Sequence, residues 1–137
     1  MVQVIAGDRG SGKTKRLLSI ANETAEKTNG HIVWISINSE GIFELDSSIR
    51  HVNVSSFPIS SVDSLIGFIY GMLSQDYDIE SIFIDNLSVI LNDDTDAVTD
   101  FLKRAKKISE KAEVNFVFGI KNMKCKLENI EAEYLAV

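Results

Sequence analysis

The sequence of 137 residues contains a single cysteine, a single proline and no long apolar run. Cys125 alone can form neither an internal disulfide nor a zinc site, which fits a reducing compartment. No stretch is long and apolar enough to span a bilayer, and the amino terminus lacks the basic region of a secretory signal. We therefore expect a cytoplasmic protein without a membrane segment, whose mature form begins at Met1.

Positive charge is also scarce. The sequence has 14 Lys and Arg residues against 20 Asp and Glu residues, which gives a formal net charge of −6. Tight binding of duplex DNA depends on clustered Lys and Arg side chains. The sequence thus carries no strong nucleic-acid signal, although it does not exclude a local basic patch. Its composition is that of a globular domain with a core, and its length predicts one domain over residues 1–137.

Apolar segments rich in β-branched residues predict the strands. Five segments qualify, at residues 2–5, 31–37, 50–54, 81–84 and 114–120. Continuous apolar runs, such as HIVWISI in the second segment, suit parallel strands that are covered on both faces. The segment at residues 50–54 is the weakest of the five.

Segments with a 3.6-residue apolar period predict three helices, at residues 13–28, 62–73 and 96–112. Ser60 and Asp63 have the spacing of a capping box before the second helix, with Asp in place of the usual Glu. Asp93, Asp94 and Asp96 lie at the start of the third helix, where the helix dipole favours anions. The inward face of this third helix is expected to carry Val98, Phe101, Leu102, Ala105, Ile108 and Ala112.

Strands and helices alternate along the chain, which is the pattern of βαβ units. The sequence therefore predicts an α/β fold, a three-layer sandwich with a mostly parallel central sheet. Residues 121–137 are compatible with either a strand or a short helix. No internal repeat, low-complexity tract or linker interrupts this order.

A glycine-rich segment links the first predicted strand to the first helix. Residues 7–14 read GDRGSGKT and match the phosphate-binding loop pattern G-x-x-x-x-G-K-[ST] in the context that this pattern requires. The glycines permit backbone angles closed to other residues, so main-chain N–H groups can surround a β-phosphate at the amino end of the helix. We assign nucleotide binding to Gly7, Asp8, Arg9, Gly10, Ser11, Gly12, Lys13, Thr14 and Lys15. A flexible glycine-rich turn is the alternative interpretation.

Two residues of this loop and one distant acid are expected to carry the chemistry. Lys13 reaches the β- and γ-phosphates, and Thr14 places its hydroxyl on Mg²⁺. Such proteins also need an acid at the end of a neighbouring strand to hold the metal. Asp85 follows the strand SIFI and is the candidate, since ligands bind at the carboxyl edge of open α/β sheets. The alternative is that Asp85 only caps the following turn.

Several classes of phosphate-loop protein fit poorly. Ras-type GTPases use D-x-x-G as their second motif and N-K-x-D to read guanine, whereas residues 85–88 read DNLS and residues 121–124 read KNMK. Kinases of the adenylate kinase type have a lid with several arginines, and the four arginines of this chain are spread along it. The thymidine kinase type adds a cysteine zinc ribbon, which one cysteine cannot form.

The loop GDRGSGKT, the strand HIVWISI leading into Asn38-Ser39-Glu40, and the segment IESIFIDNLSVIL together resemble the core of RecA-type ATPases, which include KaiC-like ATPases and DnaB-type helicases. The resemblance covers roughly residues 1–120. It implies that the strand VNFVFGI lies between the loop strand and the Asp85 strand. It also implies that Glu40 is the general base, with Glu44 and Asp46 as rivals; a solvated loop acid beside Gly41 is the alternative interpretation of Glu40.

The resemblance implies two further roles near the carboxyl end of the chain. Lys121 or Asn122 would sense the γ-phosphate, and Lys121, Lys124 or Lys126 would serve as a positive finger in a neighbouring subunit. The family's long DNA-holding loops have no counterpart here.

These observations predict a Mg²⁺-dependent ATPase that binds ATP or another nucleoside triphosphate, with Lys13 and Glu40 as its catalytic residues. Its intrinsic turnover is expected to be low and to rise on self-assembly or with a protein partner, because a missing positive finger costs about 10³–10⁵-fold. A non-catalytic nucleotide-binding switch is the main alternative, and a small-molecule kinase is a third.

Overall fold

The computed structural model of the chain describes residues 1–121 and 133–136. Six strands form one sheet in the order β3-β2-β4-β5-β1-β6, and every pairing is parallel. The strands are β1 (Val2–Gly7), β2 (His31–Ser36), β3 (Arg50–Asn53), β4 (Ile79–Ile84), β5 (Asn115–Lys121) and β6 (Glu133–Ala136). Strand β5 lies between β1 and β4, as expected from the resemblance.

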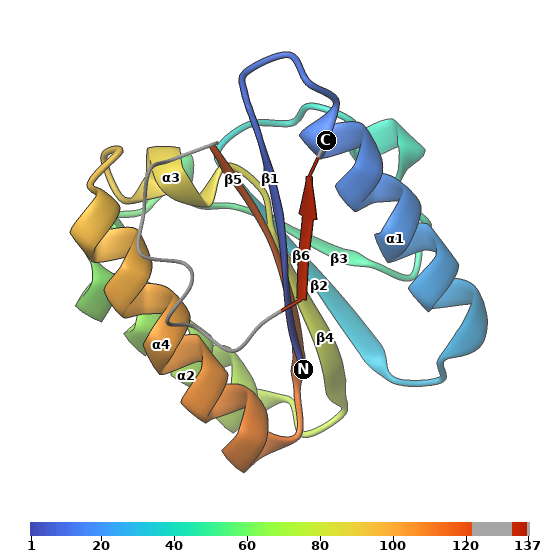
Figure 1. Cartoon of the computed structure of the whole chain (residues 1–137). Helices are drawn as coiled ribbons and strands as arrows, with labels where there is room; N and C mark the ends of the chain where they lie inside the picture. The colour runs from blue at the N-terminus through green and yellow to red at the C-terminus, as the bar shows by residue number, and fades with distance from the viewer. Residues whose placement is uncertain (122–132, 137) are drawn as a thin grey trace.

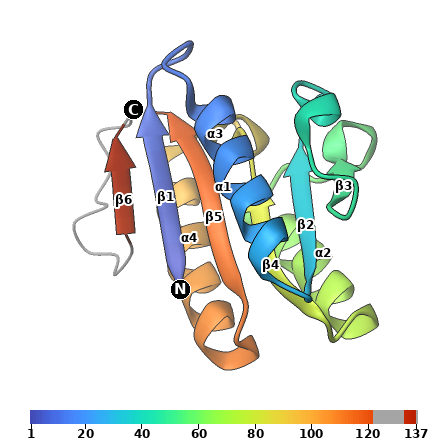
Figure 2. The same ribbon diagram turned by 90° about the vertical axis from the view of Figure 1, so that its right-hand side faces the viewer.

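Helices cover both faces of this sheet and give three layers (Figures 1 and 2). On one face lies α1 (Lys13–Lys27), and on the other lie α2 (Val62–Gln75), α3 (Leu87–Ile90) and α4 (Thr95–Ala112). Two short 3-10 turns, η1 (Ile42–Glu44) and η2 (Val54–Ser56), flank β3. The predicted α/β architecture is confirmed, and the short helix α3 is an addition that its apolar sequence did not predict.

Alternation along the strands explains why the sequence reads as continuous apolar runs. In β2, Val33 and Ile35 join the core beneath α2 and α4, whereas Ile32 and Trp34 join the core beneath α1. Successive side chains of a strand point to opposite faces, and here both faces are covered. The Trp34 ring stacks near Phe83 on the α1 side, with ring centroids 6.1 Å apart.

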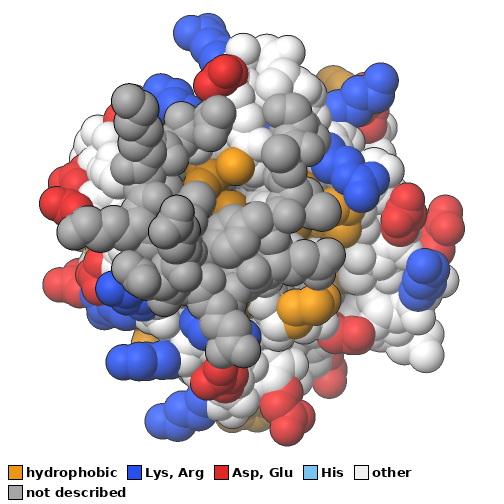
Figure 3. Space-filling model, in the orientation of Figure 1, with side chains coloured by type: hydrophobic (Ala, Val, Ile, Leu, Met, Phe, Trp, Pro, Cys, Tyr) orange, Lys and Arg blue, Asp and Glu red, His pale blue; other side chains and the backbone are white. Residues whose placement is uncertain are grey.

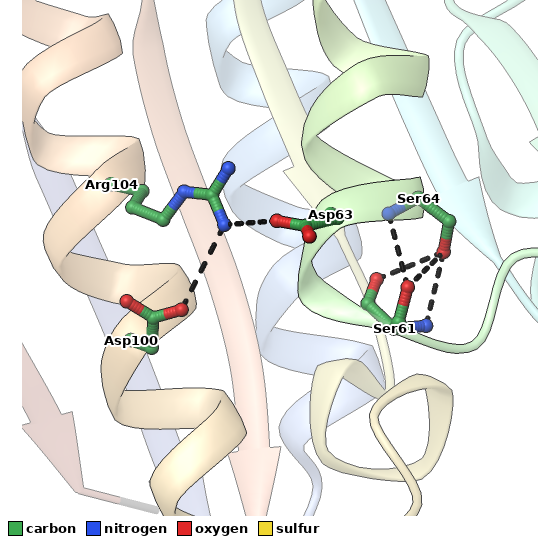
Figure 4. Close-up of polar contacts among 5 residues, drawn as sticks. All are labelled: Ser61, Asp63, Ser64, Asp100 and Arg104. Carbon is green, nitrogen blue, oxygen red and sulfur yellow. Dashed lines mark hydrogen bonds and ion pairs between the residues drawn. The ribbon is translucent and has the colours of Figure 1, made fainter.

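The start of α2 corrects one prediction. Ser61, not Ser60, is the N-cap, and it forms a capping box with Ser64 (Figure 4). Asp63 instead accepts a hydrogen bond at 2.7 Å from Arg104 of α4. The serine cluster offered two registers for the cap, and the sequence alone did not decide between them.

The acids predicted at the start of α4 lie there, whereas its carboxyl end differs from expectation in detail. Asp94 is the N-cap and accepts hydrogen bonds from the N–H groups of Asp96 and Ala97. Ala112 is exposed rather than inward. The buried position is Ser109, whose hydroxyl donates to the carbonyl oxygen of Val114 at 2.6 Å.

Figure 3 shows the molecular surface in the orientation of Figure 1. Among the described residues, acidic and basic side chains are intermixed on this face. Among the described residues on this face, neither sign of charge forms a separate patch. Among the helices of the described ranges, none combines the length and the apolar character that crossing a membrane requires.

Candidate functional site

The carboxyl ends of four parallel strands bring the predicted site residues to one edge of the sheet. The glycine-rich segment follows β1, the Glu40 segment follows β2, Asp85 follows β4, and Lys121 ends β5. These segments lie far apart in the sequence, and the strand order brings them together at the upper end of the sheet in Figure 2. In open α/β sheets this is the edge at which ligands bind.

The glycine-rich segment has the backbone that its composition predicts. Gly10 and Gly12 have φ angles of 81° and 96°, a region that favours glycine. Gly12 is the N-cap of α1 and supplies no side-chain hydrogen bond to the first turn. The amino end of α1, with its partial positive charge, therefore lacks the side-chain acceptor that usually caps a helix.

The side chain of Lys13 is folded back on this segment. Its Nζ atom donates to the carbonyl oxygen of Gly7 at 2.6 Å and to that of Asp8 at 3.2 Å. Burial lowers the pKa of Lys13, the charge of Lys121 lowers it further, and Asp85 and Asp8 oppose the shift. The ammonium is thus only partly solvated, and neutral carbonyl groups provide its closest acceptors.

Asp85 lies behind the first turn of α1. Its Oδ2 atom accepts a hydrogen bond from the Thr14 hydroxyl at 2.8 Å, and its Oδ1 atom accepts from the N–H group of Asn86 at 2.9 Å. The residue is 1% exposed. Burial raises the pKa of Asp85, and the charge of Glu40 adds to this, whereas both hydrogen bonds and the charge of Lys13 act in the opposite direction.

The space beside Asp85 depends on a glycine in the neighbouring strand. A Cβ atom at Gly119 of β5 would lie 3.2 Å from Asp85 Oδ1 and 3.8 Å from the Leu17 side chain. A glycine inside an apolar strand often marks such a close approach. The glycine within the apolar run VNFVFGI is therefore the sequence signal for this close approach.

The segment that carries Glu40 is fixed on both sides of this residue. Before it, Asn38 Oδ1 accepts a hydrogen bond from the Glu40 N–H group at 3.0 Å. After it, Gly41 has a φ angle of 75° and packs so closely on Leu18 that a Cβ atom would lie 2.6 Å from its Cδ1. The backbone of Glu40 is therefore held in place, while its side chain is exposed at the edge of the sheet.

A hydrogen-bonded chain behind Asn38 was missed in the sequence. The buried Ser36 hydroxyl lies 2.6 Å from the carbonyl oxygen of Asn38 and 2.9 Å from His51 Nε2 on β3. A hydroxyl has one hydrogen, which goes to the carbonyl, so His51 must donate from Nε2. Spacing alone could not reveal this chain, because it joins two strands through their register.

The rivals of Glu40 lie away from the cavity lining. Asp46 Oδ1 accepts hydrogen bonds from the N–H group and hydroxyl of Ser48, which lower the pKa of Asp46. Glu44 lies in η1, where its carbonyl oxygen accepts from Asn22. Neither acid lines the cavity that Glu40 faces.

That cavity has a volume of about 710 Å³, within the range of about 300–1,000 Å³ typical of small-molecule sites. Most predicted site residues line it, whereas Gly7, Asp8, Ser11 and Asp85 are not among its lining residues. The lining residues are Arg9, Gly10, Gly12, Lys13, Thr14, Lys15, Ile37, Asn38, Glu40, Asn86, Ser88, Val89, Gly119, Ile120 and Lys121. Asn122, Lys124 and Lys126 lie outside the described residues.

This arrangement can bind an anion and a hard cation next to each other. The Lys13 ammonium and the amino end of α1 attract phosphate oxygens. The Asp85 carboxylate and the Thr14 hydroxyl are oxygen donors of the kind that Mg²⁺ prefers. The chain has no match among the models of known protein families or among curated proteins.

Proposed function

We propose that this chain is a Mg²⁺-dependent ATPase of the RecA-type, with low intrinsic turnover. The observation that carries the proposal is the contact between Thr14 and the buried Asp85, directly beside Lys13. Burying a carboxylate without an ion pair is costly. Among the described residues, Asp85 forms no ion pair, so a bound cation is the partner that would offset this cost.

Each residue has a defined task in this proposal. A bound Mg²⁺ would supply positive charge that neutralises the phosphate oxygens. Thr14 and Asp85 would hold the metal, directly or through its water shell. Lys13 would exchange the carbonyl oxygens of Gly7 and Asp8 for phosphate oxygens, a change from neutral to charged acceptors that strengthens its hydrogen bonds.

Glu40 would orient the attacking water and accept its proton. A carboxylate suits this task, because it needs only to be placed within hydrogen-bond reach of the water. The fixed backbone on both sides of Glu40 supports the assignment, as does its electrostatic effect on Asp85. Glu44 and Asp46 lack this placement.

The exposure of Glu40 supports low intrinsic turnover. Electrostatic stabilisation is weak in a water-filled site and grows when water is excluded. We therefore expect the rate to rise when a second copy of the chain or a protein partner covers the cavity. The same exposure favours the alternative of a nucleotide-binding switch, in which binding occurs without hydrolysis.

A titration with ATP, with and without Mg²⁺, tests the proposal. The wild-type chain should bind ATP, and Mg²⁺ should tighten binding. Lys13→Ala should weaken binding by about 30-fold or more, because it removes a partly desolvated charge contact. Lys27→Ala is the matched control, since Lys27 lies exposed at the other end of α1.

Equal affinity for ATP in wild type and Lys13→Ala would contradict the proposal. Where ATP does bind, an assay of phosphate release distinguishes an ATPase from a nucleotide-binding switch. ATP binding without phosphate release at any protein concentration would favour the switch, whereas release that rises with protein concentration would favour an ATPase activated by assembly.

A further inference from the structure

Lys121 is a second cation at the cavity, and its backbone is firmly placed. It is the last residue of β5, lies opposite Gly7 in the β1–β5 register, and lines the cavity. Its N–H group donates to the Ser88 hydroxyl at 3.1 Å. The side chain is 44% exposed, and its Nζ atom lies 3.0 Å from Asp93 Oδ1. Lys121 therefore borders the cavity, while its ammonium is paired with Asp93.

Asp93 reaches Lys121 from an unusual backbone. Asn92 and Asp93 have φ angles of 59° and 56°, so two consecutive residues other than glycine adopt the left-handed region. The Asp93 N–H group donates to the carbonyl oxygen of Ser88 at 2.7 Å, and Asn92 Nδ2 donates to that of Ser60 at 3.2 Å. Such strain persists only where surrounding contacts support it, and it concentrates at functional positions.

The ion pair of Lys121 with Asp93 lies among the other charges around the cavity. The charge of Lys121 is close enough to contribute to the lowered pKa of Lys13, and both residues line a space that suits an anion. Asp93 supplies a negative charge to one of them. A polyphosphate entering the cavity would offer Lys121 a stronger, multiply charged alternative.

We propose that Asp93 competes with the ligand for Lys121, holding its ammonium until a polyphosphate enters the cavity and displaces the carboxylate. The proposal rests on the proposed function, because it requires polyphosphate binding at this site. It adds a negative regulatory residue, Asp93, that weakens binding. It also links occupancy of the cavity to the loop between α3 and α4.

Inorganic triphosphate, titrated without metal, is the probe. It has no nucleobase, and without a metal ion Asp85 cannot contribute to binding through a bound cation. Asp93→Asn should bind it about two- to fivefold more tightly, the range that the loss of an exposed ion pair allows. Lys121→Met should bind it about tenfold more weakly. The two partners of one ion pair thus have opposite effects.

Both variants should fold. Asn tolerates the left-handed region as well as Asp does, and the Asp93 backbone contact to Ser88 does not involve the carboxylate. Met keeps most of the Lys121 stem. Thermal denaturation checks that both variants are folded. In the double variant Asp93→Asn/Lys121→Met, the affinity for triphosphate should equal that of Lys121→Met alone.

Asp63→Asn is the matched control. Asp63 forms an exposed ion pair with Arg104 at 2.7 Å, and neither residue lines the cavity (Figure 4). Its loss should leave the affinity for triphosphate unchanged. A gain in affinity equal to that of Asp93→Asn would show a general effect of net charge and would overturn the proposal.

Amide hydrogen exchange gives a second readout that does not depend on activity. Triphosphate should speed exchange at the Asp93 amide in wild type, because the loop loses its contact to Lys121. In Lys121→Met, exchange should be fast already and should not respond. Protection that is unchanged by ligand in wild type would overturn the link between cavity and loop.

The two proposals fail in different ways. If wild type binds triphosphate through Lys13 but Asp93→Asn has wild-type affinity, the competition is wrong and the proposed function stands. If wild type does not bind triphosphate, the proposed function fails and the competition fails with it.

Discussion

The two ends of the sheet both gather titratable side chains, but folding affects their charges in opposite ways. At the amino end, His31 Nδ1 and Asp76 Oδ2 lie 2.7 Å apart, and Asp78 is nearby. The His31 hydrogen bond is the main cause that lowers the pKa of Asp76. At the carboxyl end, burial raises the pKa of Asp85. Folding thus favours the charged form of one carboxyl group and disfavours that of the other.

This difference supports the carboxyl end as the ligand site of the proposed function. The amino end has a cavity of only about 160 Å³, and its Asp76 carboxylate is hydrogen-bonded to His31 Nδ1 and accepts from the N–H group of Asp78. The carboxyl end combines a larger cavity with a buried acid and a partly desolvated lysine. Perturbed groups of this kind, placed beside a cavity, are typical of functional sites.

The largest expected effect at the carboxyl end of the sheet is on the rate of ATP hydrolysis. Glu40→Gln should reduce phosphate release by about 10²–10⁴-fold, the contribution usual for a general base, and should leave ATP affinity close to wild type. The amide keeps the size of the side chain and removes its ability to accept the proton. Single-turnover phosphate release and an ATP titration measure the two quantities.

Glu44→Gln is the control for this prediction, because Glu44 lies in the same segment and does not line the cavity. It should hydrolyse ATP at the wild-type rate. If Glu40→Gln is as active as wild type, the base lies elsewhere, and the segment after β2 has lost its assigned role.

The second effect is on the free energy of unfolding. Replacing an aspartate by asparagine should change it in opposite directions at the two ends of the sheet. Asp85→Asn should raise the free energy of unfolding of the ligand-free protein by about 1 kcal/mol at pH 7, or about 3 °C in Tm. It should also abolish the tightening of ATP binding by Mg²⁺. Asp76→Asn should instead destabilise the protein at pH 7, because it removes a carboxylate whose charged form folding favours.

The pH dependence follows from linkage. The pKa of Asp85 is higher in the folded than in the unfolded state, so wild-type stability falls as pH rises from about 3.9 through the folded value. The advantage of Asp85→Asn therefore disappears in acid. For Asp76 the folded pKa is lower, so its contribution is present above about 3.9 and is lost as pH falls through the folded value. Chemical denaturation at several pH values checks both trends.

Sequence reasoning succeeded where the signal is local. The glycines and Lys13 lie within one short segment, and the apolar runs follow from strands buried on both faces. Placing Asp85 beside Thr14 required only the rule that ligands bind at the carboxyl ends of parallel strands. The structure brings these two side chains to 2.8 Å.

Features that depend on register or on exact placement were not predictable. The contact of Ser36 with His51 depends on how β2 pairs with β3, and the ion pair of Asp93 with Lys121 depends on two left-handed residues. The capping box was predicted one residue too early, because Ser60 and Ser61 offer equivalent side chains. Local composition does not distinguish such alternatives.

The smallest expected effect uses the two histidines of the chain, one for each end of the comparison. His51→Phe should slow ATP hydrolysis by about two- to tenfold, the effect of one lost neutral hydrogen bond, without changing ATP affinity. The reason is that His51 supports Asn38, and through it Glu40, by way of the Ser36 hydroxyl. His51→Gln should restore most of the rate, since the glutamine amide can donate from nearly the same position. His31→Phe should leave hydrolysis unchanged, because His31 contacts Asp76 at the far end of β2. A loss of rate in His31→Phe equal to that in His51→Phe would mean that the two ends of the sheet do not act separately.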